Sequence, residues 1–261
     1  MQRDPLLDFS GQVALVTGAA SGLGRALSEA LALRGARLVA SDIDEAGLEA
    51  LAADLTAAGA EVVTEVADVS TEATAERLVA VAVERFGSLE LAVNNAGIGH
   101  PFTAFEDITE AMFDRQIAVN VRSVLFGMKH QLRQMTGQGR GTILNVSSMA
   151  GLNGAPKIGA YAAAKHAVVG MTRTAAVEHA RAGLRINAIC PYYTHTPLVD
   201  NAVLVPGGDT ADAHALLESG CPMRRLGQPS EIIAVMLMLL SPGNTFMTGQ
   251  AIAVDGGVSA L

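Results

Sequence analysis

The sequence predicts an α/β fold: a doubly wound, parallel, seven-stranded sheet with helices on both faces. Short runs rich in apolar residues alternate with longer segments of helical pattern along the chain. Several of these runs are almost continuously apolar, as expected for strands that helices cover on both faces. No repeat, charge block or Pro/Ser-rich linker divides the 261 residues, so we expect one domain over residues 1–261.

Seven runs are expected to form the strands, and six longer segments the main helices. The strands are, in chain order, Val13–Thr17, Arg37–Ser41, Glu61–Val66, Leu89–Asn94, Thr142–Ser147, Arg185–Cys190 and Ala251–Val254. The helices are Leu23–Arg34, Glu45–Ala58, Thr71–Phe86, Met112–Gln134, Ala160–Arg181 and Ser230–Leu240. Glycines 35, 59, 87 and 183 stand where four of these helices should stop. Alternation of strand and helix implies right-handed crossovers between parallel strands.

One stretch, residues 192–229, breaks this alternation. It has no strand pattern, Pro197, Pro206 and Pro222 interrupt it, and only Thr210–Ser219 looks helical. It follows the carboxyl end of the sixth strand, where open α/β sheets bind ligands. We interpret it as a substrate lid, with a surface insertion as the alternative. An uncharged, hydrophobic alcohol or ketone would suit its apolar positions, Leu198, Val199, Ala202, Val203, Leu204 and Val205.

Composition and charge restrict the partners and the location. Half of the residues are apolar and 17% are charged, which allows a large core. The net charge of −8 disfavours nucleic acid and anionic membrane as partners. Cys190 and Cys221 have neither disulfide nor metal-ligand spacing, and the N-terminus lacks an apolar signal core. The longest apolar stretch, Ile232–Leu240, is too short for a membrane span of about 20 residues, so we expect a cytoplasmic protein.

A glycine-rich turn follows the first predicted strand. Gly18, Gly22 and Gly24 allow a tight turn and a close approach of pyrophosphate, and the next helix offers unpaired N–H groups. Glycines at a strand–helix turn are often only structural, and the spacing here is G-x-x-x-G-x-G rather than G-x-G-x-x-G. Because they follow the first strand of a βαβ unit, they predict a nucleotide site.

An acidic residue at the end of the second strand indicates which dinucleotide is bound. Asp42 can accept hydrogen bonds from the adenosine ribose diol. A 2′-phosphate there would bring like charges within about 4 Å, which costs on the order of 4 kcal/mol at an effective dielectric near 20. The closest cations, Arg25 and Arg37, are expected to lie elsewhere. The sequence therefore favours NAD over NADP, unless Asp42 only caps the next helix.

Three side chains have the chemistry needed to move a proton to or from an alcohol oxygen. Tyr161 and Lys165 stand one helical turn apart and share a helix face. An ammonium favours the phenolate, so we expect Lys165 to depress the pKa of Tyr161 and to bind the nicotinamide ribose. Tyr161 would then be the general base for alcohol oxidation and the general acid for ketone reduction. Ser148 can hydrogen-bond the substrate oxygen, while Ser147 should point to the other side.

The six histidines show no ligand spacing, and we predict no metal site. His166 should point to a different side of its helix from Lys165. His100 and His195 lie near the expected mouth of the site, and substrate contact is the less favoured interpretation for both.

Together these motifs resemble the short-chain dehydrogenase/reductase family, in its compact branch. The resemblance runs from Gly11 to Gly257 and is carried by Thr17 to Gly24, Asp68-Val69, Asn94 to Gly97, Asn120, Ser148, Tyr161-x-x-x-Lys165, Asn187 and Asp255-Gly256-Gly257. It implies a Rossmann-like fold and a redox enzyme. Such enzymes are commonly homotetramers, paired through the long helices and the C-terminal strand.

The resemblance also implies roles for individual residues. Asn120 would hold a kinked helix and a water that joins Lys165 to solvent. Asp68 and Val69 would flank the adenine, and Asn95 to Gly97 would form the wall behind it. Thr196 would touch the nicotinamide carboxamide. The catalytic set would be Asn120, Ser148, Tyr161 and Lys165, and the cofactor set Gly18, Ser21, Gly22, Leu23, Gly24, Asp42, Asp68, Val69, Asn95, Ala96, Gly97, Tyr161, Lys165, Pro191 and Thr196.

The chain departs from the family after the sixth strand. Most relatives have glycine after the proline that ends this strand, and this sequence has Tyr192 and Tyr193 after Pro191. Since a tyrosine resists the positive φ open to glycine, the turn is expected to differ. We predict that Tyr192 or Tyr193 narrows the pocket around a cyclic or aryl substrate; alternatively, both rings fill core beneath the lid. The expected substrate contacts are Ser148, Tyr161, Tyr192, Tyr193 and Leu198.

The favoured function is NAD-dependent interconversion of a hydrophobic secondary alcohol and its ketone. One alternative is a reductase of 3-oxoacyl thioesters on a carrier protein, which would favour NADPH and a basic docking surface. Asp42 and the net charge argue against it. Enoyl reductase is less favoured, because relatives with that chemistry space their tyrosine and lysine more widely. A non-catalytic dinucleotide sensor is opposed by the intact Ser148, Tyr161 and Lys165.

Overall fold

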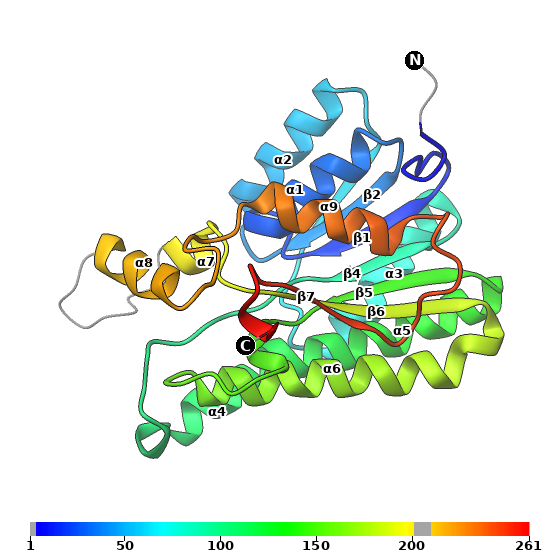
Figure 1. Cartoon of the computed structure of the whole chain (residues 1–261). Helices are drawn as coiled ribbons and strands as arrows, with labels where there is room; N and C mark the ends of the chain where they lie inside the picture. Colours follow the sequence, from blue (N-terminus) through cyan, green and yellow to red (C-terminus); the bar gives the residue numbers. More distant parts are fainter. Residues whose placement is uncertain (1–3, 201–209, 261) are drawn as a thin grey trace.

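A parallel, seven-stranded sheet forms the centre of the protein (Figure 1). The computed structural model describes residues 4–200 and 210–260. The strand order is β3-β2-β1-β4-β5-β6-β7, so the winding direction reverses between β1 and β4. Open α/β sheets bind ligands at the carboxyl ends of the strands beside such a reversal. The predicted doubly wound, parallel sheet is confirmed.

The strands lie close to their predicted positions, because each is a short run rich in apolar residues. Shifts are confined to a residue or two at the ends. Their bounds are β1 (Val13–Thr17), β2 (Arg37–Asp42), β3 (Val62–Val66), β4 (Leu91–Asn94), β5 (Gly141–Val146), β6 (Leu184–Pro191) and β7 (Ala251–Val254).

One layer of helices covers each face of the sheet (Figure 1). One face packs on α1 (Gly22–Ala32), α2 (Glu45–Ala57) and α9 (Pro229–Leu240). The other packs on α3 (Glu72–Phe86), α5 (Ser123–Gln138) and α6 (Gly159–His179). Alternate residues of a strand serve the two cores: Ala14 and Val16 lie in the first, and Val13 and Leu15 in the second.

The helix predicted over Met112–Gln134 contains a π-helical segment. It comprises α4 (Glu110–Gln116), a π turn over Ile117–Arg122, and α5. Asn120, in the π turn, is fully buried. Its amide exchanges two hydrogen bonds with the backbone of Ile98 after β4, at 2.8 and 3.0 Å. The expected kink at Asn120 therefore takes the form of a π turn, a distortion that is frequent at functional sites.

The excursion between β6 and α9 carries two helices among its described residues. The helix predicted over Thr210–Ser219 is present as α8, while α7 (Pro197–Asp200) was not predicted. A single parallel bridge joins Thr194 to Gly227. The predicted lid positions 202–205 lie outside the described residues. Among the helices described, none is both long enough and apolar enough to cross a lipid bilayer.

Candidate active site

Tyr161 and Lys165 lie in the first turns of α6, beside the end of β5. Lys165 is only 4% exposed. Its Nζ lies 5.5 Å from the centre of the Tyr161 ring and donates a hydrogen bond of 2.9 Å to the carbonyl of Val146. The two side chains therefore face the same region, as their spacing predicts.

Burial disfavours the charged form of both groups. It raises the pKa of Tyr161 to about 12, and a hydrogen bond with Ser148 offsets only part of this rise. Burial likewise lowers the pKa of Lys165 to about 8. The expected depression of the Tyr161 pKa by Lys165 is therefore not observed, because desolvation of the phenolate outweighs the other influences.

The two serines after β5 have different partners. Ser147 is buried and donates a hydrogen bond of 2.9 Å to the carbonyl of Lys165. Ser148 accepts a hydrogen bond of 3.1 Å from the backbone of Ala150, which starts a short 3₁₀ turn, and it interacts with the Tyr161 phenol. Ser148 is therefore the serine on the side of Tyr161, and Ser147 is bonded to the backbone of α6.

The chain after β4 passes close to Lys165. A Cβ on Gly97 would lie 2.8 Å from Asn120 Oδ1 and 3.4 Å from Lys165 Nζ. Any residue larger than glycine at position 97 would force its backbone or the Asn120 side chain to move. The structure thus brings Gly97, Asn120, Lys165 and Tyr161 together.

His100 contacts the start of α6 in a way that the sequence did not reveal. Its Nε2 lies 3.4 Å from the backbone N–H of Tyr161, and its Nδ1 lies 2.8 Å from the carbonyl of Pro101. These partners favour the tautomer with the proton on Nδ1. His166 is exposed and bonds within its own helix, which confirms that it points away from Lys165.

The glycine-rich turn is closely packed. Gly18 and Gly22 have φ values of +67° and +53°, and a Cβ on Gly24 would lie 1.9 Å from the carbonyl oxygen of Gly18. Ser21 precedes α1 without capping it through its side chain. The first N–H groups of α1 therefore remain available to an anion.

Asn95 fastens this turn to β4. Its Nδ2 donates to the carbonyls of Thr17 and Gly18, at 2.9 and 3.1 Å. The hydroxyl of Thr17 in return accepts from the backbone N–H groups of Asn95 and Ala96, each at 3.1 Å. The Asn95 side chain thus fixes the shape of the glycine-rich turn, a role that the sequence pattern did not reveal.

Asp42 joins the glycine-rich turn to the end of β2. Its carboxylate accepts hydrogen bonds from Ala20, Ile43 and Asp44, at 3.0, 2.7 and 3.1 Å. The side chain that caps α2 is Asp44, which accepts from Gly47, so the alternative role of Asp42 as the cap is wrong.

The two nearest arginines have other partners. Arg25 pairs with Glu29 and Asp54, at 3.0 and 2.6 Å, and Arg37 lies over the ring of Phe86. The prediction that both lie elsewhere is confirmed.

The remaining predicted cofactor residues lie around the same strand ends. Asp68 is exposed and accepts from the backbone of Ser70 at 2.9 Å, and Val69 is partly buried beside it. Pro191 ends β6. Thr196 is buried, and a Cβ added to Gly22 would lie 3.5 Å from the Cβ of Thr196. The start of the excursion therefore packs on the start of α1.

Tyr192 and Tyr193 lie under the excursion. Their rings meet edge to face, with centroids 4.9 Å apart. The Tyr192 hydroxyl donates a hydrogen bond of 3.0 Å to the carbonyl of Leu217 in α8, and Tyr193 packs against Leu217 and Leu226. Burial raises the pKa of Tyr193 to about 12, with smaller contributions from Tyr192 and Tyr161. Tyr193 therefore lies within electrostatic range of Tyr161.

The tyrosine that replaces the usual glycine is not strained. The positive φ angles of non-glycine residues in the described chain fall on Lys157 and Arg224, not on Tyr192.

A cavity of about 170 Å³ adjoins the rings of Tyr192 and Tyr193 and reaches Cys221, Met223 and Val254. Leu198 is half exposed and approaches Gly99, so it lies across from the chain that follows β4.

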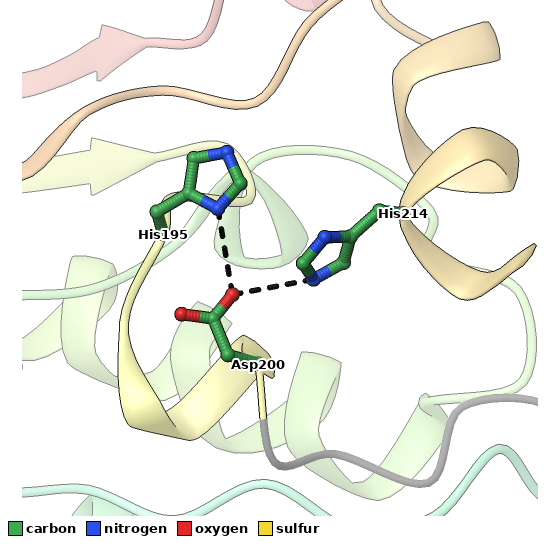
Figure 2. A group of neighbouring side chains, drawn as sticks. All are labelled: His195, Asp200 and His214. Carbon is green, nitrogen blue, oxygen red and sulfur yellow. Dashed lines mark ion pairs between the residues drawn. The ribbon is translucent and has the colours of Figure 1, made fainter. Parts of the chain in front are cut away.

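Two histidines of the excursion meet at one carboxylate, which the sequence did not predict. His195 and His214 approach the same oxygen of Asp200, and Figure 2 shows the three side chains converging. Their separations along the chain match no familiar ligand motif, and α7 was not expected to turn Asp200 back toward His195.

The chain is similar to known proteins over nearly its whole length. A family model described as "Enoyl-(Acyl carrier protein) reductase" matches residues 18–259. Levodione reductase of Leifsonia aquatica is 42% identical over 260 residues, which cover 98% of this chain and 97% of that protein. Cis-4-hydroxycyclohexanecarboxylate dehydrogenase of Sinomonas cyclohexanicum is 39% identical, over 97% of this chain and 98% of that protein.

Solved structures are similar over the same extent. A crystal structure of levodione reductase has a TM-score of 0.93 and covers 97% of this chain and 99% of its own. A 3-ketoacyl-(acyl-carrier-protein) reductase of Brucella melitensis, complexed with NADH, has a TM-score of 0.88 at 34% identity, over 97% of this chain and 100% of its own.

Proposed function

The chain belongs to the short-chain dehydrogenase/reductase family, and from this premise we propose that it is an NAD-dependent oxidoreductase of a hydrophobic, cyclic secondary alcohol and its ketone. The observation that carries the proposal is the shared location of Tyr161, Lys165 and Ser148 at the carboxyl end of β5. These groups can hold and move one proton, which is the part of the reaction that the protein itself must perform.

The residues present fit a nicotinamide dinucleotide. The closely packed glycine-rich turn and the uncapped start of α1 suit a pyrophosphate. Asp42 suits a ribose diol, and the like charge of its carboxylate opposes a 2′-phosphate. Arg25 and Arg37 are paired elsewhere. We therefore propose NAD, held by the cofactor residues that the family resemblance implies.

Proton transfer is assigned to the Tyr161 hydroxyl. When bound, the dinucleotide supplies the hydride carrier, and the positive charge of its oxidised ring favours the phenolate. In alcohol oxidation Tyr161 takes the proton of the substrate hydroxyl, and in ketone reduction it returns that proton. Ser148 donates a hydrogen bond to the substrate oxygen as charge develops there. Lys165 and Asn120 hold the phenol and the chain after β4 in position.

The apolar side chains near Tyr161 support a ring-shaped substrate. Tyr193 lies within electrostatic range of Tyr161 and packs on the cluster of Leu217 and Leu226, while Leu198 stands half exposed beside Gly99. Flat aromatic and branched apolar walls suit a cyclohexane or aryl ring better than a polyol. The name of one relative contains a hydroxycyclohexane, which supports a cyclohexane ring over an aryl ring.

A homotetramer in the cytoplasm is also proposed. Val177 on the outer side of α6 is 82% exposed, Leu125 on α5 is about half exposed, and Phe246 before β7 is fully exposed. Exposed apolar side chains on long helices and beside an edge strand suit contacts between subunits. Light scattering should find a tetramer, and Val177→Asp should yield smaller species; a monomeric wild type would refute the tetramer.

Reduction of a 3-oxoacyl group on a carrier protein is the second candidate. The similar 3-ketoacyl reductase structure favours it, and the description of the matching family model also names an acyl carrier protein. The net charge of −8 opposes it, because acyl carrier docking calls for a basic surface.

One assay separates the candidates. The purified protein is incubated with NAD or NADP and with cyclohexanol, 1-phenylethanol or 2-butanol, and the reduced cofactor is followed by absorbance. In parallel, NADH or NADPH is supplied with a 3-oxoacyl thioester. We expect turnover with NAD and the ring alcohols. Turnover confined to the thioester with NADPH would favour the second candidate, and binding of NAD without any turnover would favour a sensor.

A further inference from the structure

The excursion contains a cluster of ligand-type side chains outside the catalytic site. The Nδ1 atom of His195 and the Nε2 atom of His214 lie 3.5 and 3.2 Å from the same oxygen of Asp200 (Figure 2). All three atoms lie within 4.8 Å of one another. Tetrahedral zinc ligands, at about 2.0–2.2 Å from the ion, are separated by roughly 3.3–3.6 Å. The two nitrogen–oxygen distances are close to this separation.

Two of these atoms lack hydrogen-bond partners among the described residues. Asp200 Oδ1 and His214 Nε2 are buried, and neither makes a hydrogen bond of acceptable geometry within the described part of the chain. Their separation of 3.2 Å is within ion-pair distance, but its geometry makes no hydrogen bond between the two atoms. Buried polar atoms without partners are uncommon and call for an explanation, and an ion bound between them would satisfy both.

The local fold holds the three residues in this arrangement. The backbone N–H of His195 bonds to Gly227, and that of Asp200 bonds back to Thr196, which turns α7 toward His195. In α8, Leu217 stands three residues after His214 and packs on Tyr193 and Val199. Residues three apart share a helix face, so this packing also directs His214 toward α7.

A second histidine–carboxylate contact in the protein lacks these features. His130 lies 3.3 Å from Glu72, but Lys129 binds the same carboxylate oxygen at 2.5 Å. A cation of the protein already satisfies that carboxylate, and a single imidazole faces it. The difference singles out the cluster of His195, Asp200 and His214.

We propose that His195, Asp200 and His214 form a binding site for a divalent transition metal, best fitted by zinc, which fastens α7 to α8 beside Tyr193. Two imidazoles and one carboxylate are the ligand types that zinc accepts, whereas magnesium and calcium prefer oxygen. Three protein ligands leave a fourth position for water. The metal would hold α7 and α8 in position relative to each other and would take no part in proton transfer at Tyr161.

The test measures zinc binding directly. The full-length protein, freed of any polyhistidine tag and stripped with a chelator, is titrated with zinc in a calorimeter. The wild type should bind one zinc per chain with a micromolar or lower Kd, and zinc should raise its thermal midpoint. Cobalt in the same site should give visible absorption bands typical of tetrahedral coordination.

Variants assign the site. His214→Ala and Asp200→Asn should each weaken zinc binding more than about 100-fold, since even the loss of a group that only supports a ligand weakens it 10- to 100-fold. His166→Ala, on the exposed side of α6, should bind like the wild type. Circular dichroism checks folding, and Asp200→Asn keeps the side-chain shape in case His214→Ala does not fold.

Two results would overturn the site. One is a wild type that takes up no stoichiometric zinc, and the other is zinc binding that His214→Ala and Asp200→Asn leave unchanged. Neither measurement needs turnover, so a failed metal site leaves the proposed oxidoreductase activity intact, and a failed activity leaves the metal site testable.

Discussion

The carboxyl edge of the sheet and the excursion over residues 192–229 are held in different ways. At the sheet edge, Thr17, Asn95 and Asp42 tie the glycine-rich turn to neighbouring strands by several hydrogen bonds. The described part of the excursion rests on a small apolar cluster around Leu217 and Leu226 and on the hydrogen bond from Tyr192. The first region therefore suits fixed chemistry, and the second suits selection among substrates.

This difference predicts that substitutions in the two regions have different effects on activity. A change at the sheet edge should alter turnover of every substrate by a similar factor, because it affects the proton or the cofactor. A change in the excursion should alter the ratio between substrates. The predictions below test this division, from the largest effect to the smallest.

Tyr161→Phe should lower kcat at least about 1,000-fold for ring and chain alcohols alike, since it removes the hydroxyl that carries the proton. NAD binding, measured by fluorescence titration, should stay within a few-fold of the wild type. Tyr193→Phe is the matched control, because it removes a nearby buried hydroxyl with no assigned proton. Comparable losses in both variants would show that Tyr161 has no special role.

The pH dependence should follow the Tyr161 hydroxyl. Burial raises the pKa of Tyr161 to about 12, so the phenolate is the minor form at neutral pH. Below the apparent pKa, kcat/KM for oxidation should rise about tenfold for each pH unit. Ketone reduction uses the neutral phenol and should lack this rise. The slope should be the same for ring and chain alcohols; a flat oxidation profile from pH 6 to 9 would contradict the assignment.

Asp42→Ala should reduce the preference for NAD over NADP by on the order of 100-fold, because it removes the charge that opposes a 2′-phosphate. The ratio of kcat/KM values for the two cofactors measures the effect. The ratio between cyclohexanol and 2-butanol should not change. Asp44→Ala serves as the control, since it removes a helix cap nearby. An unchanged cofactor ratio in Asp42→Ala would remove Asp42 from cofactor selection.

Tyr192→Gly should change the ratio of kcat/KM for cyclohexanol over 2-butanol by about tenfold, the scale of a modest change in apolar contact. It removes the ring that packs on Tyr193 and the hydrogen bond to Leu217. Tyr192→Phe loses only the hydrogen bond and should change the ratio less. If the ratio is the same in all three proteins, Tyr192 fills core and does not select substrates.

Much of the fold follows from local patterns in the sequence. The strands are apolar runs with clear ends. Short motifs contain the glycine-rich turn, Asp42, and the pair of Tyr161 and Lys165, and the spacing within each motif determines how its residues are arranged. The kink at Asn120 was expected, but its form as a π turn depends on hydrogen bonds to Ile98, far away in the sequence.

Other features depend on long-range contacts that no local pattern encodes. Burial, not the Lys165 charge, decides the direction of the Tyr161 pKa shift. The meeting of His195 and His214 at Asp200 requires α7 to turn back and α8 to pack on Tyr193. His195, in the loop before α7, and His214, in α8, become neighbours only through that packing, so the sequence predicted no ligand cluster there.

The most direct test of the central claim follows the hydrogen that leaves the substrate. The protein is incubated with NAD and cyclohexanol that carries deuterium on the carbinol carbon, and the products are examined by mass spectrometry. We predict cyclohexanone together with reduced NAD that has gained the deuterium, and no labelled cofactor with Tyr161→Phe over the same period. Failure of the wild type to move deuterium from any ring alcohol to NAD, or equal transfer by Tyr161→Phe, would contradict the account.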